Sequence, residues 1–126
     1  MPWITRHTKK ASKDRSFNTQ KRREVYDNPL WRRMRMAHLR NFPLCEICEM
    51  EDRVTLATEV HHINSFLNAE TVEERDQLAF QDSNLMSLCD PCHQRCHSGD
   101  LKGTKTKEEI KNRIDQIRSD ENATNN

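Results

Sequence analysis

The stretch NLMSLCDPCH, residues 84–93, joins a predicted strand, a cysteine pair and the start of a helix. Strand-like alternation along its first six positions would place Leu85 and Ser87 on one face and Met86 and Leu88 on the other. An Asp-Pro pair then favours a first helical turn, and we expect a helix over residues 91–98 that Gly99 ends. His93 and His97 would lie four residues apart on one face of that helix.

A second stretch, RVTLATEVHHI at residues 53–63, has the β-branched and aliphatic content of two short strands or one bent strand. Near its end, His61 and His62 are neighbours, which a regular strand would point to opposite faces of a sheet. We expect regular pleating to fail or end there, by a bulge, a strong twist or a strand terminus. Both imidazoles would then face the helix that carries His93, with Asn84 beside them, around one ββα unit.

Two Cys-x-x-Cys pairs, Cys45 with Cys48 and Cys89 with Cys92, are separated by 40 residues. Together they could supply the four thiolates of a structural zinc site, which adds folding free energy to a chain with a small core. Such a site is closed, so any catalysis must lie elsewhere. Disulfides are the alternative, but a reducing compartment and the odd fifth cysteine disfavour them. That fifth cysteine, Cys96, is interpreted as a small buried hydrophobe.

Composition favours one small domain in the cytoplasm. The chain has 126 residues, of which 33% are hydrophobic and 33% are charged. It contains no apolar run long enough for a transmembrane helix, so we expect no membrane partner. Its first ten residues, MPWITRHTKK, lack the apolar core of a secretory signal, and a secreted protein is therefore not expected.

Charge is divided unevenly along the chain. Residues 1–43 carry twelve Lys or Arg and three acids (12 − 3 = +9), whereas residues 44–126 carry nine and seventeen (9 − 17 = −8). A basic arm of this kind indicates contact with nucleic-acid phosphates. For residues 9–21 alone, solvated and disordered charge is an equal alternative. We expect residues 1–24 to be mostly extended or disordered.

Three further helical segments are predicted. Asn28 as a cap and Pro29 at the first position favour a helix that ends near residue 41 and has a basic surface beside an apolar stripe. A capping box of Thr71 with Glu74 predicts a short helix or ordered loop. A second box, at residues 106–109, starts a C-terminal helix with one isoleucine stripe. The last eight residues, SDENATNN, are expected to form a disordered tail.

The two stretches together resemble the HNH endonuclease family, whose zinc-containing members carry two Cys-x-x-Cys pairs in the same places. The resemblance covers about residues 44–97. It implies an α+β fold, namely a small ββα-metal (His-Me finger) domain with a four-cysteine zinc site, flanked by a basic N-terminal helix and a C-terminal helix. The expected divisions are 1–43 for the basic arm and helix, 44–99 for the nuclease domain, and 100–126 for the C-terminal helix and tail.

The resemblance also implies roles for individual residues. His62 matches the general base that activates water, Asn84 the residue that positions this base and braces the loop, and His93 a ligand of the catalytic divalent metal. His61 stands where most members have a metal-binding aspartate, although colicin-type members also have two adjacent histidines. His97 is a further candidate ligand. The metal could be Mg, Mn, Ni, Co or Zn, and imidazole suits the last four better than Mg.

The expected function is that of a metal-dependent endonuclease acting on duplex DNA, by nicking or by double-strand cleavage, and leaving 5′-phosphate and 3′-hydroxyl ends. A neutral histidine can take a proton near pH 7, and one metal can stabilise the charge on the phosphorane and the leaving oxygen. Small members of this kind resemble phage enzymes that work with terminase in DNA packaging. Two alternatives stay open, a zinc-ribbon-like module and a catalytically inactive HNH-fold DNA-binding protein.

Overall fold

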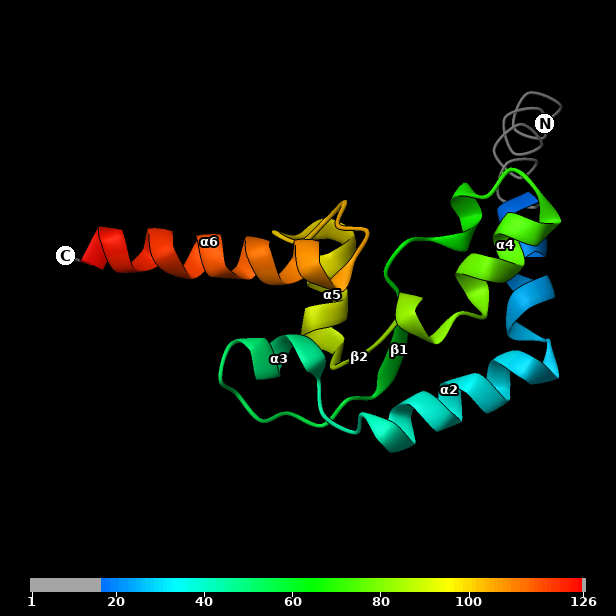
Figure 1. The fold of residues 1–126 in the computed structure, drawn as a ribbon, viewed down its shortest axis with the longest axis horizontal. Coiled ribbons are helices and arrows are strands. Elements are labelled where there is room, and N and C mark those ends of the chain that lie inside the picture. The colour runs from blue at the N-terminus through cyan, green and yellow to red at the C-terminus, as the bar shows by residue number, and fades with distance from the viewer. Residues whose placement is uncertain (1–16, 126) are drawn as a thin grey trace, which may run out of the picture.

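The computed structural model describes residues 17–125, which are arranged around a small two-stranded sheet (Figure 1). Shorter helices surround this sheet, and the long C-terminal helix extends away from it at one end (Figure 1). None of the described helices has the length and apolar character needed to cross a membrane. After a helix over residues 17–26, the elements are α2 (Pro29–Asn41), α3 (Glu46–Met50), β1 (Glu59–His62), η1 (Phe66–Asn68), α4 (Val72–Ala79), η2 (Asp82–Asn84), β2 (Leu85–Leu88), α5 (Asp90–Ser98) and α6 (Lys107–Asn125).

The two strands and α5 form the predicted ββα unit. β1 and β2 pair antiparallel in regular register, from Glu59 opposite Leu88 to His62 opposite Leu85. All four residues of β2 are buried, because α2 and α3 also pack against this strand. α5 packs against β1. The expectation of an α+β fold with flanking helices is therefore confirmed.

The helix predicted after Asn28 is α2. The side chain of Asn28 accepts a hydrogen bond of 2.9 Å from the backbone N–H of Leu30, and Pro29 occupies the first turn. α2 contacts both strands and buries Trp31 and His38. Leu30 is 39% exposed, so the apolar stripe is narrower than the sequence indicated.

His38 is a packing residue that joins α2 to three other elements. Its Nδ1 lies 2.9 Å from Asp82 Oδ1, and its Nε2 lies 3.0 Å from Glu46 Oε2. The same Glu46 oxygen accepts a hydrogen bond of 2.6 Å from the backbone N–H of Ser87. This partly buried network fixes α2 against α3, η2 and β2, and so holds one side of the ββα unit.

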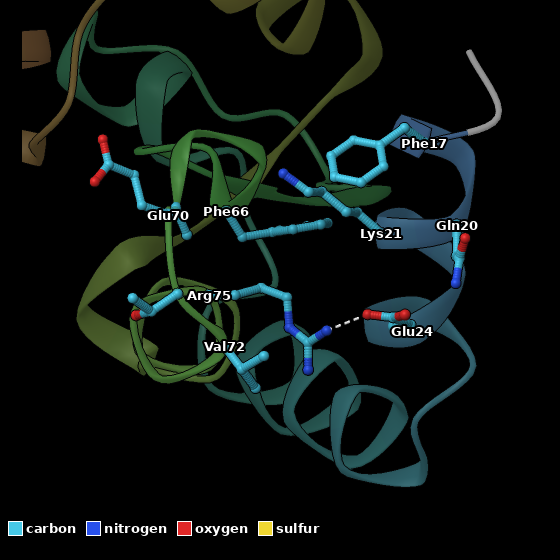
Figure 2. Close-up of a pocket in the computed structure, with 10 residues that line it drawn as sticks. Phe17, Gln20, Lys21, Glu24, Phe66, Glu70, Val72 and Arg75 are labelled. Carbon is cyan, nitrogen blue, oxygen red and sulfur yellow. Dashed lines mark hydrogen bonds and ion pairs between the residues drawn. The ribbon is translucent and has the colours of Figure 1, made fainter. Parts of the chain in front are cut away.

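Part of the N-terminal segment expected to be extended or disordered is helical, so that prediction is wrong for residues 17–24. Val25 is fully buried against Phe66 and Ala79. Figure 2 shows the N-terminal helix facing α4, with an ion pair between Arg75 and Glu24. A helix with one buried apolar residue has no readable hydrophobic period, and its order comes from these tertiary contacts. Residues 1–16 lie outside the described part.

The C-terminal helix begins as predicted, since Thr106 Oγ1 accepts a hydrogen bond of 3.1 Å from the backbone N–H of Glu109. Ile110 and Ile114 are fully buried against the cysteine-rich core. The prediction of a disordered tail is wrong for residues 119–125, because these residues continue α6. No glycine or proline follows position 103, so nothing in the sequence ends the helix there.

Candidate active site and metal centres

Four cysteines gather between the starts of α3 and α5. Cys45 caps α3 and Cys48 lies within it, while Cys89 caps α5 and Cys92 lies in its first turn. All four are buried free thiols, and their sulfur atoms lie within 4.8 Å of one another. Cys48 Sγ is 3.8 Å from Cys89 Sγ and 3.7 Å from Cys92 Sγ. A tetrahedral ion with metal–sulfur bonds of about 2.3 Å separates its ligands by about 3.8 Å, so the cluster fits one metal ion.

Cys96 is separate from this cluster. It is 7% exposed and packs in the same core, and burial raises the pKa of its thiol to about 11. A protonated, buried thiol behaves as a small hydrophobe.

A second cluster consists of His61 on β1 with His93 and His97 on α5. The ring centroid of His61 lies 5.1 Å from that of each helix histidine, and His93 Nε2 lies 3.0 Å from His97 Nε2. One nitrogen from each ring falls within a common span of 4.8 Å. Burial is the main cause that lowers the pKa of His61 to about 3, and the neighbouring histidine rings lower it further. Burial also lowers the pKa of His97. Neutral imidazoles in this arrangement can ligate one metal ion. His61 is buried, whereas His97 is exposed, so the cluster is open to solvent on the side of α5.

Glu59 lies behind the histidine cluster. Its Oε2 is 2.6 Å from Nδ1 of His93, which leaves the Nε2 of that ring directed toward His97. Glu59 precedes His61 by two residues, so both side chains point to the same face of β1. Glu59 was not among the predicted site residues, although its spacing of two residues from His61 could have identified it.

His62 points away from the histidine cluster, to the other face of β1. Its ring stacks on Trp31, with centroids 4.6 Å apart, and meets the edge of Phe66 at 5.0 Å. Its Nε2 lies 3.0 Å from the carbonyl oxygen of Ala79, whereas its Nδ1 has no partner among residues 17–125. Burial lowers the pKa of His62.

The expectation that both imidazoles face α5 is therefore wrong. Pairing of β1 with β2 is regular through His61 and His62, so the pleat separates the two side chains, and the strand simply ends at His62. Both rings nevertheless line one hollow of about 270 Å³ together with His93 and His97. His62 is 7% exposed, and two of its neighbours, Phe66 and Ala79, belong to the smaller apolar core cluster.

Asn84 braces the loops around His62. Its Oδ1 accepts a hydrogen bond of 2.9 Å from the backbone N–H of Asn64. Its Nδ2 donates to the carbonyl oxygens of Asn64, at 2.9 Å, and Leu78, at 2.7 Å. Leu78 precedes Ala79, whose carbonyl oxygen lies 3.0 Å from His62 Nε2, so hydrogen bonds connect Asn84 to His62 through the end of α4.

The N-terminal helices also reach the site. Arg22 and Tyr26, from the helix over residues 17–26, line the same hollow as the histidines. Neither residue was predicted to belong to the site, and Trp31 was predicted to lie in the core. No local spacing signals these contacts, because they join segments more than thirty positions apart.

Comparisons with known proteins found a matching family and a similar solved structure. The HNH endonuclease family matches residues 45–99. Among solved structures, the chain is similar to the HNH endonuclease of the deep-sea thermophilic bacteriophage GVE2, crystallised with manganese ion. The two share 33% sequence identity with a TM-score of 0.55, over 71% of this chain and 91% of the phage enzyme. The comparison with curated proteins gave no match.

The ββα unit thus combines a buried cysteine cluster and a more exposed histidine cluster, each of which could hold a metal ion. The chain belongs to the HNH endonuclease family and is a nuclease. HNH nuclease domains act on DNA, which agrees with the basic N-terminal region.

Proposed function

We propose that this nuclease is a metal-dependent endonuclease that hydrolyses phosphodiester bonds in duplex DNA, with His62 as general base. The supporting observation is the tautomer that the surroundings of His62 impose. A carbonyl oxygen only accepts, so the contact of Nε2 with Ala79 requires the proton on Nε2. Nδ1 is then the unprotonated nitrogen, and burial keeps the ring neutral.

The proposed reaction starts with a water molecule in the hollow beside His62. Nδ1 accepts a proton from this water as its oxygen attacks the phosphorus atom, and the 3′ oxygen leaves. Trp31 and Phe66 hold the ring, so that its lone pair keeps one direction. The products would carry 5′-phosphate and 3′-hydroxyl ends, from nicking or from double-strand cleavage.

His61 and His93 are proposed to hold the catalytic divalent metal, with His97 as a third ligand. When bound, the ion would act as a Lewis acid that stabilises charge on the phosphorane and the leaving oxygen. Glu59 would orient His93 from behind, as carboxylates commonly do for metal-binding histidines. Three nitrogen ligands favour Mn, Co, Ni or Zn over Mg. The related phage enzyme was crystallised with manganese ion, which supports this preference.

The ion proposed for Cys45, Cys48, Cys89 and Cys92 is structural zinc. Sulfur–sulfur distances of 3.7 and 3.8 Å match a tetrahedral zinc thiolate site. With four protein ligands, this site would leave no position for substrate. Its proposed role is to join α3 to α5 and thereby hold α5 beneath β1.

Duplex DNA is proposed to contact the basic N-terminal region. Arg32, Arg33 and Arg40 are exposed on α2 and form no ion pair within residues 17–125. On this proposal residues 1–43 are the DNA-binding arm, 44–99 the catalytic unit and 100–126 a C-terminal extension. Because the helix over residues 17–26 is packed, the arm is best tested by deleting residues 1–16. We expect weaker DNA binding with a shallower salt dependence.

A role with a phage terminase is proposed from resemblance to phage enzymes alone. Co-purification with a phage terminase would test it.

The experiment that tests the main proposal is supercoiled-plasmid cleavage by the zinc-loaded chain with Mg, Mn, Co, Ni or Zn, followed by end mapping. We expect cleavage that depends on the added metal and leaves 5′-phosphate ends. No cleavage with any metal, together with retained DNA binding, would favour a catalytically inactive HNH-fold module. If the protein retains zinc but neither cleaves DNA nor binds a second metal ion, a zinc-ribbon-like module would be favoured.

A further inference from the structure

A second hollow lies next to the first at the histidine cluster. The first, of about 270 Å³, is bounded by Arg22 and Tyr26 on its outer side. The second, of about 220 Å³, is bounded by the loop between α5 and α6. Four residues line both hollows, namely His61, His62, Ser65 and His97. The histidines therefore stand between two adjoining hollows, one that reaches the helix over residues 17–26 and one that reaches the loop between α5 and α6.

The outer wall of the second hollow carries two lysines, Lys102 and Lys105. Both are exposed, and neither ammonium group has a partner among residues 17–125. Other cations nearby are engaged. Arg95 pairs with Asp100 and Glu51, and Lys107 pairs with Glu46. The two lysines that face the hollow are thus free to bind an anion.

The loop that carries these lysines is held in one conformation. Leu101 is fully buried, and Thr104 Oγ1 donates a hydrogen bond of 2.8 Å to its carbonyl oxygen. Arg113 on α6 donates to the carbonyl oxygen of Lys102 at 2.7 Å. Gly103 has a φ of +87°, a conformation that side-chain-bearing residues rarely adopt. A constrained loop presents its cations at a lower entropic cost than a mobile one.

We infer that the second hollow is a phosphate-binding subsite, in which Lys102 and Lys105 bind the DNA phosphate next to the one that is cleaved. The inference rests on the proposed function. A DNA strand whose scissile phosphate lies at the histidines must continue on both sides of them. On one side it meets Arg22, and on the other it meets the two lysines. Lysine suits this role because an ammonium group binds phosphate as a point charge without demanding one orientation.

Binding measurements test the charge contribution first. The probe is a fluorescent DNA duplex titrated with full-length, zinc-loaded protein without activating metal, over a range of salt concentrations. The variants are Lys102→Gln and Lys105→Gln, singly and together, and the matched control for each single variant is Lys111→Gln, an exposed lysine on α6 outside both hollows. Each lost phosphate contact should reduce the salt slope by about 0.9. A slope equal to that of Lys111→Gln would overturn the inference.

Position is tested with a substrate whose cleavage site has been mapped. A neutral methylphosphonate replaces one phosphate at a time on either side of the cut. At one neighbouring phosphate, the replacement should raise KM for the wild type but cause no further rise for the double lysine variant. Additive effects at both neighbours would overturn the inference. Failure of the wild type to cleave would instead count against the proposed function, and the salt slope would still decide whether the lysines bind DNA.

Discussion

The indole of Trp31 stacks on the imidazole of His62, with ring centroids 4.6 Å apart and planes inclined by 28°. Trp31 lies on α2, outside the segment that matches the HNH family, whereas His62 ends β1 within it. The N-terminal region therefore contributes a wall of the site in addition to its positive charge.

Replacing Trp31 should affect the orientation of the His62 base, and hence kcat, more than it affects DNA binding. We expect Trp31→Ala to lower kcat by roughly tenfold, since an aromatic pair contributes about 0.5–1.5 kcal/mol, and to change KM for DNA little. The free energy of unfolding should fall by about 3–5 kcal/mol, measured by urea denaturation. Trp31→Phe, which keeps a ring at this position, should recover most of the turnover. An unchanged kcat in folded Trp31→Ala would show that the stack has no positioning role.

Removing the His62 ring should abolish cleavage without loss of either metal. The reason is that Nδ1 of His62 is the only proposed acceptor for the proton of the attacking water. The measurement is single-turnover cleavage by His62→Ala, with metal content and DNA binding as controls. Free imidazole should restore part of the activity by entering the space beside Trp31 and Phe66. Near-normal cleavage by His62→Ala would remove this residue as the base.

Truncation of His93 or His97 should weaken binding of the activating metal without affecting the zinc site. We expect His93→Ala and His97→Ala each to raise the metal concentration needed for half-maximal cleavage by at least about tenfold, while zinc content stays the same. Calorimetric titration of Mn²⁺ or Ni²⁺ into the zinc-loaded protein measures the same loss without cleavage. If His97→Ala binds metal like the wild type, His97 is not a ligand.

Asn84 should stabilise the fold through the two hydrogen bonds that its Nδ2 donates. Asn84→Asp replaces the Nδ2 donor by an acceptor that faces the carbonyl oxygens of Asn64 and Leu78. We expect a loss of about 1–3 kcal/mol for each carbonyl left unpaired, seen as a lower urea midpoint. Asn112→Asp, at an exposed position on α6, is the matched control and should change stability by less than about 0.5 kcal/mol. Equal midpoints for the two variants would contradict the bracing role.

The cysteine cluster should be needed for folding, unlike the remaining cysteine. Cys45→Ser should release zinc and unfold the ββα unit, because metal binding and folding are coupled in domains with small cores. Cys96→Ala should keep its zinc, since it lies outside the cluster. Metal analysis and circular dichroism, with and without a chelator, measure both effects. Retention of zinc and helical structure by Cys45→Ser would show that the cluster is not a structural site.

The sequence by itself determined the elements whose signals are local. Capping residues and proline marked the starts of α2 and α6, glycine marked the end of α5, and strand alternation marked β2. The Cys-x-x-Cys spacing and the i, i+4 histidines of α5 indicated two separate clusters, and both are assembled in the structure. These features could be read because each depends on residues within one turn or one strand.

Only the tertiary structure decided how His62 is held and what else lines the site. Regular pleating sends His62 to the face opposite His61, where Trp31, Phe66 and the carbonyl of Ala79 define its environment. The helix over residues 17–26 is ordered by packing against η1 and α4, although its sequence lacks an apolar period. Contacts between segments far apart in the chain leave no local pattern, because burial depends on which surfaces meet after folding.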